Sequence, residues 1–407
     1  MTTNARNDRS IHPQALKGLR VIEMGQLIAG PFAGKTLADF GADVIKIEPP
    51  GQGDPLRGWR MVKDGTSVWW QVQSRNKRSI ALDLRNPEGQ ALARKLIDSA
   101  DVLIENFKPG TLESWGMGYE TLSKTNPGLI MLRISGYGQS GPYRDLPGFG
   151  AIGEAMGGLR YLTGEPGRLP VRCGISIGDT LAALHGTIGV LVALQHRTAQ
   201  GGRGQVIDVA LNEAVLNVME SLIPEYDAFG AVREPAGSAL PGIAPSNAYA
   251  CRDGAVLIAG NGDSIFRRLM VAIGRSDLAE DPALANNAGR VKRVTEIDQA
   301  IGAWAATRSV SEVLEALGRA MVPAGRIYTA RDIVEDPHYQ ARGMLQRIKT
   351  RDGDSLLVPG VVPILSETPG AIRTAAPRLG EDTDEVLKEL GLSAEGRDGL
   401  RKRGVLG

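Results

Sequence analysis

The sequence predicts an α/β protein whose main domain is a parallel, doubly wound β-sheet. Short apolar runs, rich in β-branched residues, recur along the first third of the chain and are typical of buried strands. Helical patterns lie between several of them, and this alternation of strand and helix favours a parallel sheet with helices on both faces. The predicted strands are Leu19–Met24, Asp43–Ile47, Ser79–Leu84, Asp101–Ile104 and Leu129–Ile134.

Two of the intervening helices have recognisable starts. Gly30-Pro31 places a proline in a first helical turn, where its missing N–H costs nothing. Asn86-Pro87-Glu88 is an N-cap followed by a proline and an acid, and it leads into a helix over Gln90–Ser99. Further elements are predicted as a long helix from Gly178 to about Arg197, a strand at Gln205–Leu211 and a helix from Asn212.

A change in composition divides the rest of the chain. Gly230–Ser246 is rich in Gly, Pro and Ala, as linkers are. A hairpin signal follows, in which Arg252-Asp253-Gly254 joins two apolar runs. We expect a large domain over 14–225, a linker and small α+β domain over 226–325, and a return to the large domain over 326–407. The later helices are predicted at Ser264–Ile273, Val294–Thr307, Val310–Ala320 and Thr383–Leu390, and a strand at Pro359–Leu365.

Composition excludes several classes of function. The 47 Lys and Arg residues nearly balance the 46 Asp and Glu residues, so the chain has no basic stripe for nucleic acid. Two cysteines and four histidines, none in a CxxC or HxxxH spacing, predict neither a zinc site nor a disulfide framework. Met1–Pro13 lacks the apolar core of a secretory signal, and the most apolar stretch, Leu181–Leu194, is interrupted by His185 and shorter than a membrane span. We expect a cytoplasmic protein.

A glycine-rich loop matches the GxGxxG pattern of dinucleotide sites. Gly136-Tyr137-Gly138-Gln139-Ser140-Gly141 follows a predicted strand, but the next residues, Pro142 to Gly148, read as a loop. A dinucleotide fingerprint needs a helix to open at the third glycine, so that its N-terminus meets the pyrophosphate. The pattern therefore favours a glycine-lined loop that something approaches closely, and no nicotinamide site.

Asp179 stands between Gly178 and a helix-forming run. An acid in this place is ordinarily an N-cap. It is also suited to nucleophilic attack, because a carboxylate with a reference pKa of about 4 is ionised at neutral pH and needs no general base. Gly174 and Gly178 leave room for a bulky thioester.

An ordered set of motifs resembles the type III CoA-transferase family, which also contains α-methylacyl-CoA racemases and carnitine-CoA enzymes. The resemblance runs from about Leu16 to Leu392 and is closest to the succinyl-CoA-dependent branch that acts on dicarboxylates. The motifs are Leu16–Glu23, Ala29–Pro31, Leu37–Glu48, Asn76–Asp83, Glu105–Gly110, Gly136–Gly138, Gly178-Asp179 and Leu379–Thr383.

The resemblance implies a Rossmann-like large domain, an interlocked homodimer and an aspartate nucleophile at Asp179. It implies no prosthetic group, with coenzyme A entering as acyl-CoA substrate. The implied CoA contacts are Ile28, Ala29, Leu82, Asp83, Arg85, Asn106, Phe107, Lys108, Ser135, Gly136, Tyr137 and Gly138.

The chain departs from parts of the family pattern. Pro49 and Ser114 stand where formate- and oxalate-specific members carry CoA-contacting arginines, so Arg85 and Lys108 are expected to neutralise the phosphates. The glycine run of those members is absent, and Leu240-Pro241-Gly242-Ile243 stands near its place, with Gly242 a candidate substrate contact. The racemase branch needs a His-Asp pair where this chain has Phe149 and Gly150, neither of which moves a proton.

Five further side chains, which belong to three arginines, one histidine and one cysteine, carry groups that can bind or react with a substrate. Arg57, Arg60 and Arg172 have the ordinary interpretation of solvated surface residues. Arg172, seven residues before Asp179, is the candidate to clamp the second carboxylate of a dicarboxylic acid, with Arg57 as the alternative. His185 is expected to pack, and Cys173 has no paired histidine that would make it a nucleophile.

The sequence therefore predicts transfer of CoA from an acyl-CoA donor, with succinyl-CoA as the leading candidate, to a short dicarboxylic acid through covalent aspartyl intermediates. Two alternatives stay open. A racemase-like isomerase would exchange an α-proton on one substrate, and a non-catalytic acyl-CoA-binding protein would bind without turnover. No metal or nucleic acid is expected to take part.

Overall fold

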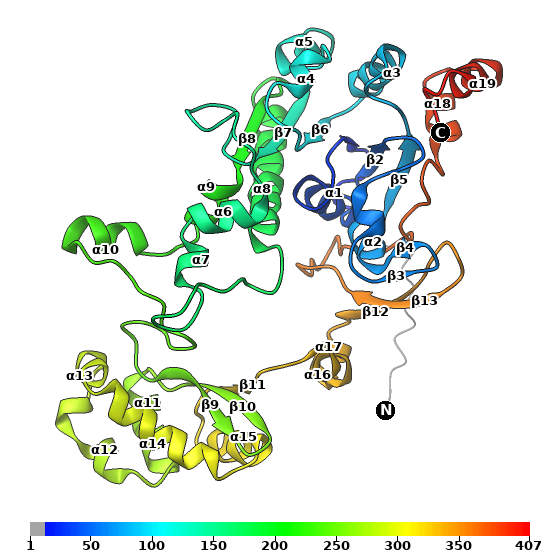
Figure 1. Ribbon diagram of the computed structural model, residues 1–407. Coiled ribbons are helices and arrows are strands. Elements are labelled where there is room, and N and C mark those ends of the chain that lie inside the picture. The colour runs from blue at the N-terminus through cyan, green and yellow to red at the C-terminus, as the bar shows by residue number, and fades with distance from the viewer. Residues whose placement is uncertain (1–12) are drawn as a thin grey trace. The chain divides into compact units, whose positions relative to one another are not determined.

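The computed structural model describes residues 13–407, so most of the expectation for Met1–Pro13 lies outside the described part. The chain forms two compact units, of which the first contains the segments up to Arg160, Cys173–Phe229 and Gln340–Gly407. The second contains Tyr161–Arg172 and Gly230–Tyr339 (Figure 1). The chain thus returns to the first unit at Gln340 instead of residue 326, and a short stretch before Asp179 belongs to the second unit.

A six-stranded parallel sheet forms the centre of the first unit. Its strand order is β5-β2-β1-β6-β7-β8, and each neighbouring pair is parallel. The chain moves outward from β1 in one direction, then returns to β1 and continues on the other side. The strands are β1 (Arg20–Glu23), β2 (Asp43–Glu48), β5 (Lys77–Ala81), β6 (Val102–Glu105), β7 (Ile130–Ser135) and β8 (Val206–Ala210). The six strands of this sheet were all predicted, with ends that differ by no more than three residues.

Apolar cores lie on both faces of this sheet because successive strand residues point to opposite sides. Val21 of β1 belongs to one core and Ile22 to the other. One face is covered by α1 (Ala29–Asp39) and α8 (Ile177–Ala199). The other is covered by α3 (Pro87–Asp98), α5 (Tyr119–Thr125), α18 (Thr383–Glu389) and α19 (Ala394–Lys402).

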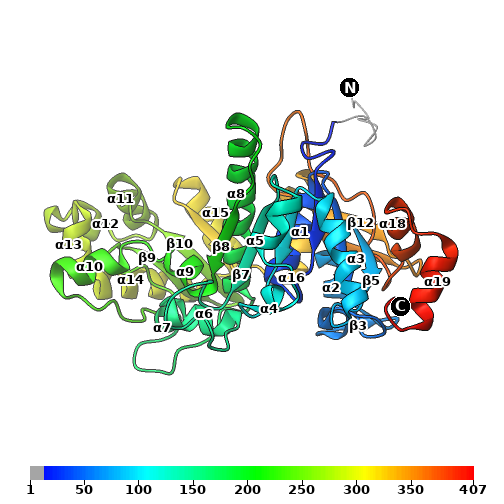
Figure 2. The ribbon, with the colours of Figure 1, turned by 90° about the horizontal axis from the view of Figure 1, so that it is seen from above.

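Helix starts follow local chemistry. The predicted cap of α3 is confirmed, since Asn86 Oδ1 accepts a hydrogen bond from Glu88 N at 2.9 Å. The long helix α8 begins at Ile177 with Ser176 in the N-cap position, so Asp179 lies in the first turn and the N-cap interpretation of Asp179 is wrong. At 23 residues α8 is long and apolar enough to cross a membrane, contrary to the expectation from sequence. Here it packs on α1, β7 and β8 (Figure 2).

Shorter helices and a hairpin complete the first unit. One hairpin is formed by β3 (Val62–Lys63) and β4 (Thr66–Ser67). The helices and the 3-10 turn are η1 (Pro55–Gly58), α2 (Val68–Gln73), α4 (Thr111–Ser114), α6 (Gly150–Met156), α9 (Leu211–Leu216) and α10 (Leu222–Phe229).

The second unit has its own apolar core between a small antiparallel sheet and helices. The predicted hairpin is confirmed as β9 (Ser246–Cys251) and β10 (Gly254–Ala259), and β11 (Ala324–Arg326) adds to β10. The helices and turn are α7 (Leu159–Leu162, at the junction), α11 (Asp263–Ala272), α12 (Ser276–Glu280), η2 (Pro282–Leu284), α13 (Asn287–Lys292), α14 (Val294–Ala306), α15 (Val310–Arg319), α16 (Ala330–Glu335) and α17 (Pro337–Ala341, at the second junction).

The C-terminal segment packs on the first sheet. A hairpin of β12 (Leu345–Lys349) and β13 (Ser355–Pro359) leads into an irregular stretch, so the predicted strand Pro359–Leu365 is wrong. Gly360 and Pro363 explain the difference, since proline has no N–H for a strand ladder. Thr383 Oγ1 accepts a hydrogen bond from Ala81 N at 3.0 Å, which ties α18 to β5.

Candidate functional site

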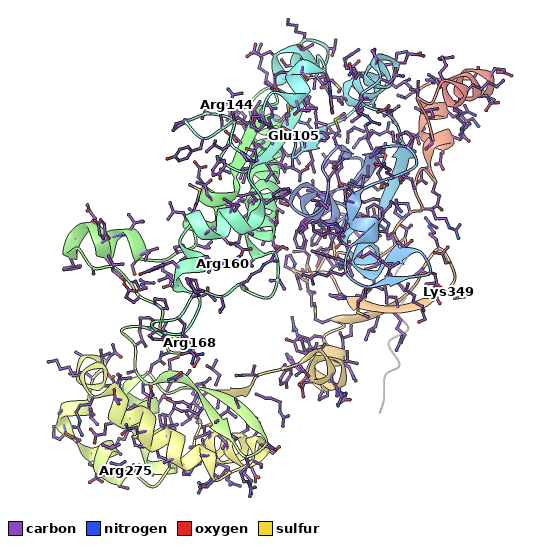
Figure 3. All side chains as sticks on the ribbon, viewed as in Figure 1. Glu105, Arg144, Arg160, Arg168, Arg275 and Lys349 are labelled. Carbon is purple, nitrogen blue, oxygen red and sulfur yellow. The ribbon has the colours of Figure 1, made fainter. Side chains whose placement is uncertain are left out.

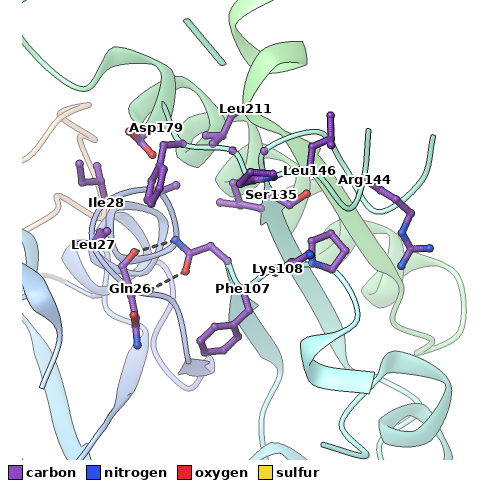
Figure 4. Close-up of a pocket in the computed structure, with 18 residues that line it drawn as sticks. Gln26, Leu27, Ile28, Phe107, Lys108, Ser135, Arg144, Leu146, Asp179 and Leu211 are labelled. Carbon is purple, nitrogen blue, oxygen red and sulfur yellow. Dashed lines mark hydrogen bonds between the residues drawn. The ribbon is translucent and has the colours of Figure 1, made fainter. Parts of the chain in front are cut away.

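The carboxyl edge of the sheet holds a pocket of about 430 Å³, at the point where the strand order reverses between β1 and β6. Ligands of open α/β sheets bind in such a crevice. The pocket takes residues from the loops after β1, β6, β7 and β8 and from the first turn of α8 (Figure 4). The lining residues are Gln26–Ala29, Asn106–Pro109, Ile134–Gly136, Arg144, Leu146–Phe149, Asp179 and Leu211.

The loops after β1 and β6 are fastened to each other at the pocket. Asn106 Oδ1 accepts a hydrogen bond from Gln26 N at 2.8 Å, and Asn106 Nδ2 donates to Gln26 O at 2.9 Å (Figure 4). Glu105 accepts from Phe107 N at 2.7 Å and pairs with Arg133 at 2.7 Å. Burial raises the pKa of Glu105, although Arg133 opposes that shift. These bonds position Asn106 and Phe107 before any ligand arrives.

A buried network of charges supports the same edge. Lys46 pairs with Glu23 and Asp54, each at 2.9 Å, and Lys77 pairs with Glu23 at 2.7 Å. Burial lowers the pKa of Lys77 to about 8, whereas for Lys46 the attraction of Asp54 and Glu23 outweighs burial and raises the pKa. Asp54 also accepts from Leu27 N at 3.1 Å. The network therefore fixes the backbone of the loop after β1.

Asp179 is half-buried and lies against the start of α6. A Cβ atom placed on Gly150 would stand only 2.0 Å from Asp179 Oδ2, so the carboxylate occupies the space that a side chain at position 150 would need. A Cβ atom on Gly178 would lie 3.0 Å from Gly150 O and 3.2 Å from Glu154 Cγ. Two glycines thus allow α6 and α8 to begin in close contact. The first turn of α8 favours the ionised carboxylate through the helix dipole.

The loop after β7 confirms the reading of the GxGxxG pattern as a loop. No helix opens at Gly141, and α6 begins only at Gly150. A Cβ atom on Gly136 would lie 2.9 Å from Gly148 Cα, so the two ends of the loop approach closely. This approach brings Leu146–Phe149 into the pocket lining.

A second pocket of about 270 Å³ adjoins the first along the same edge. It contains the ends of β2 and β5 and shares Gln26 and Phe107 with the first pocket. Phe107 packs edge-on against Trp115 at 5.4 Å between ring centroids. Arg85 is 82% exposed at this pocket and pairs with Asp83 at 3.1 Å. Two adjoining pockets suit a long ligand with an anionic part.

Most of the residues proposed as CoA contacts come together here. The first pocket contains Ile28, Ala29, Asn106, Phe107, Lys108, Ser135 and Gly136. The second contains Leu82, Asp83, Arg85 and again Phe107. Tyr137 and Gly138 line neither pocket.

The proposed substrate contacts are placed differently. Arg172 and Gly242 belong to the second unit. Arg57 lines neither pocket, because its guanidinium binds Glu48 through two hydrogen bonds of 2.8 Å and stacks 3.8 Å from the Trp70 ring centroid. That geometry gives Arg57 a structural partner in place of a ligand.

Some residues that line the first pocket were not predicted from the sequence, and Arg144 is the only charged one among them. It is eight residues downstream of Gly136, and only the close approach of Gly136 and Gly148 carries it to the pocket. Among the residues that line the first pocket, all of which lie in the described part, Asp179 is the only carboxylate, and there is no histidine. Elsewhere in residues 13–407 no group of three or more His, Cys, Asp or Glu could hold a metal ion.

The chain is similar to known proteins along nearly its whole length. A model of CoA-transferase family III matches residues 16–383. Succinyl-CoA–D-citramalate CoA-transferase of Chloroflexus aurantiacus is 49% identical, covering 93% of this chain and 94% of the relative. Succinate–glutarate CoA-transferase of Agrobacterium fabrum is 38% identical over 92% and 95%.

Solved structures agree. The crystal structure of a CAIB/BAIF family protein from Brucella suis matches with a TM-score of 0.82 and 35% identity, covering 93% of this chain and 99% of that one. The resemblance that the motifs suggested is thereby confirmed. The chain belongs to CoA-transferase family III.

Proposed function

We propose that the protein transfers CoA from succinyl-CoA to a short dicarboxylic acid, with Asp179 as the covalent nucleophile. The observation that carries this proposal is Asp179 in the pocket at the carboxyl edge, beside a second pocket that suits a nucleotide. The names of the relatives, which pair succinyl-CoA with citramalate or succinate with glutarate, support the substrate class. Coenzyme A would extend from Arg85 and Leu82 past Phe107 toward Asp179.

The reaction uses the carboxylate of Asp179 as the nucleophile of the protein and the thiol of CoA as the group that is transferred. Asp179 attacks the thioester carbonyl, so that a C–O bond forms and the C–S bond breaks. CoA thiolate departs, and a mixed anhydride of Asp179 and succinate remains on the protein. The thiolate attacks the aspartyl carbonyl of that anhydride, which gives an aspartyl thioester and releases succinate. The acceptor carboxylate attacks the thioester to form a new anhydride, and the thiolate then attacks its acyl carbonyl, which regenerates Asp179. Backbone N–H groups near Gly178 or Gly136 would stabilise each oxyanion.

The acceptor prediction concerns the second carboxylate. Succinate, glutarate and citramalate are expected to accept CoA well, and acetate and butyrate poorly, because a site built to pair a carboxylate is left unpaired by an acid without one. Arg172→Ala should lower the rate of CoA transfer to dicarboxylates and so reduce their advantage over monocarboxylates. Arg168→Ala, in the same segment, should leave both rates unchanged. Mass spectrometry of the CoA esters formed from succinyl-CoA and each acid gives the measurement. Efficient use of acetate with no preference for diacids would contradict the substrate class and leave the transferase proposal standing.

We also propose that the protein is a homodimer, interlocked as the family resemblance implies. The proposal includes a Rossmann-like sheet and a cytoplasmic location. Supporting it, one stripe of α8 is apolar and exposed in the single chain, with Leu184, Ile188, Leu191 and Val192 at helical spacing. We expect light scattering to give twice the 43.3 kDa mass of the chain. Ile188→Glu should weaken the dimer, and a monomeric parent at micromolar concentration would contradict the assembly.

The alternatives predict other results. A racemase would exchange the α-proton of one acyl-CoA in deuterated water, and Phe149 and Gly150 offer no acid or base for that exchange. A non-catalytic binding protein would bind acyl-CoA and form no new ester with any acid.

A further inference from the structure

Ser135 carries a polar group that the folded chain leaves unpaired. It is the last residue of β7, it lines the first pocket, and its side chain belongs to a residue only 6% exposed. Within the described chain its Oγ has no hydrogen-bond partner. A buried hydroxyl without a partner is destabilising, and it is retained where something else supplies the partner.

Two cations line the same pocket. Lys108 follows β6, is exposed and makes no ion pair among the residues that the structure describes. Arg144 lies on the loop beyond β7 (Figure 3), has a side chain 44% exposed, and comes no closer than 3.7 Å to its neighbour Asp145. Both cations are therefore available to an anion.

The arrangement separates these groups from the nucleophile. Asp179 stands on one side of the pocket, Lys108 and Arg144 stand on the other, and Ser135 lies between them (Figure 4). An acidic ligand oxygen beside Ser135 would accept a hydrogen bond from its hydroxyl and face both cations. Repulsion from Asp179 would be weakest at this end.

We propose that Ser135, Lys108 and Arg144 form an anion subsite, in which Arg144 is a substrate-binding residue. This inference rests on the proposed function and adds the place where an anionic oxygen of the substrate is held. The oxygen belongs either to the diphosphate of coenzyme A or to the second carboxylate of the dicarboxylic acid. Both present oxygens that a hydroxyl, an ammonium and a guanidinium bind through charge-assisted hydrogen bonds.

The unpaired hydroxyl gives the subsite an unusual signature. Ser135→Ala removes a group that the ligand-free protein cannot satisfy, so its Tm is expected to equal or exceed that of the parent. The same change should raise the Kd of succinyl-CoA about tenfold or more. Ser74→Ala is the matched control, because Ser74 is fully buried with an unpaired Oγ but lines neither pocket. It should match the Tm behaviour and leave the Kd unchanged.

The experiment measures calorimetric Kd values of the full-length variants for free CoA, acetyl-CoA and succinyl-CoA, and KM for succinate and glutarate. Arg144→Gln is compared with Arg342→Gln, an exposed arginine that lines neither pocket. Arg85→Ala in the second pocket serves as the reference for losing a contact to the nucleotide, which free CoA and all its esters share. If Ser135→Ala and Arg144→Gln weaken free CoA and all esters alike, as Arg85→Ala does, the subsite holds the diphosphate. If they spare free CoA and acetyl-CoA but weaken succinyl-CoA and raise KM for the diacids, it holds the second carboxylate in place of Arg172.

Parental Kd and KM values in both variants would overturn the subsite, as would a lower ligand-free Tm of Ser135→Ala with unchanged binding. The proposed function fails separately, if the parent binds CoA but converts no pair of ester and acid.

Discussion

Replacing Asp179 by alanine is expected to lower the rate of CoA transfer by at least about three orders of magnitude, the scale seen when a covalent nucleophile is removed. Asp179 is the only carboxylate among the residues that line the first pocket, so no other lining residue of that pocket can take over the attack. The binding of CoA esters should survive, since the residues that would hold the coenzyme come from other loops. Steady-state kinetics with succinyl-CoA, together with calorimetry of CoA binding, separates the two effects.

A covalent trap tests the same carboxylate directly. Incubation with acyl-CoA followed by hydroxylamine should convert Asp179 to a hydroxamate and inactivate the parent, and peptide mass spectrometry locates the adduct. The control is Asp277→Ala, which removes another aspartate from a first helical turn, that of α12. The Asp277→Ala variant should form the hydroxamate at Asp179 and lose activity to the same extent as the parent. Near-normal turnover of Asp179→Ala, or a hydroxamate on another residue, would rule the mechanism out.

The sheet could be predicted from the sequence because each strand signal is local. Runs such as Leu129–Ile134 are bounded by loop residues and followed by helical patterns, and Asn86-Pro87-Glu88 marks a helix start by its own chemistry. Local signals failed where tertiary contacts decide. The strand expected at Pro359–Leu365 ends at its first residue, because pairing with Leu345 finishes there.

The site was predictable to the same extent. Residues directly after strands, such as Asn106 and Ser135, meet at one edge because parallel strands end together. Arg57 has no such signal, and its pairing with Glu48 depends on a neighbouring strand that sequence spacing does not reveal. Arg144 reaches the pocket only through the approach of Gly136 and Gly148, a contact that no periodicity encodes. The sequence thus indicates which loops meet at the edge of the sheet. Tertiary packing decides which long side chains of those loops reach the pocket.

Gly150→Ala is expected to reduce kcat by about a hundredfold, although it adds a single methyl group. The new Cβ atom would stand 2.0 Å from Asp179 Oδ2, so the carboxylate must move by more than 1 Å to reach an ordinary contact distance. A displacement of about that size at a reacting group costs roughly a hundredfold in rate. Gly150 does not have a positive φ and begins α6, so alanine strains no backbone there.

The effect should appear in the chemistry and spare the binding. The Kd of CoA is expected to stay within about threefold of the parent, while the hydroxamate yield at Asp179 falls together with kcat. Gly318→Ala in α15 is the control, because its Cβ atom would meet nothing within 4 Å. Parental kcat in Gly150→Ala would show that the carboxylate does not act from the position seen against α6. A side chain at position 150 would take the space in which Asp179 rests, so the glycine keeps the carboxylate in its position against α6.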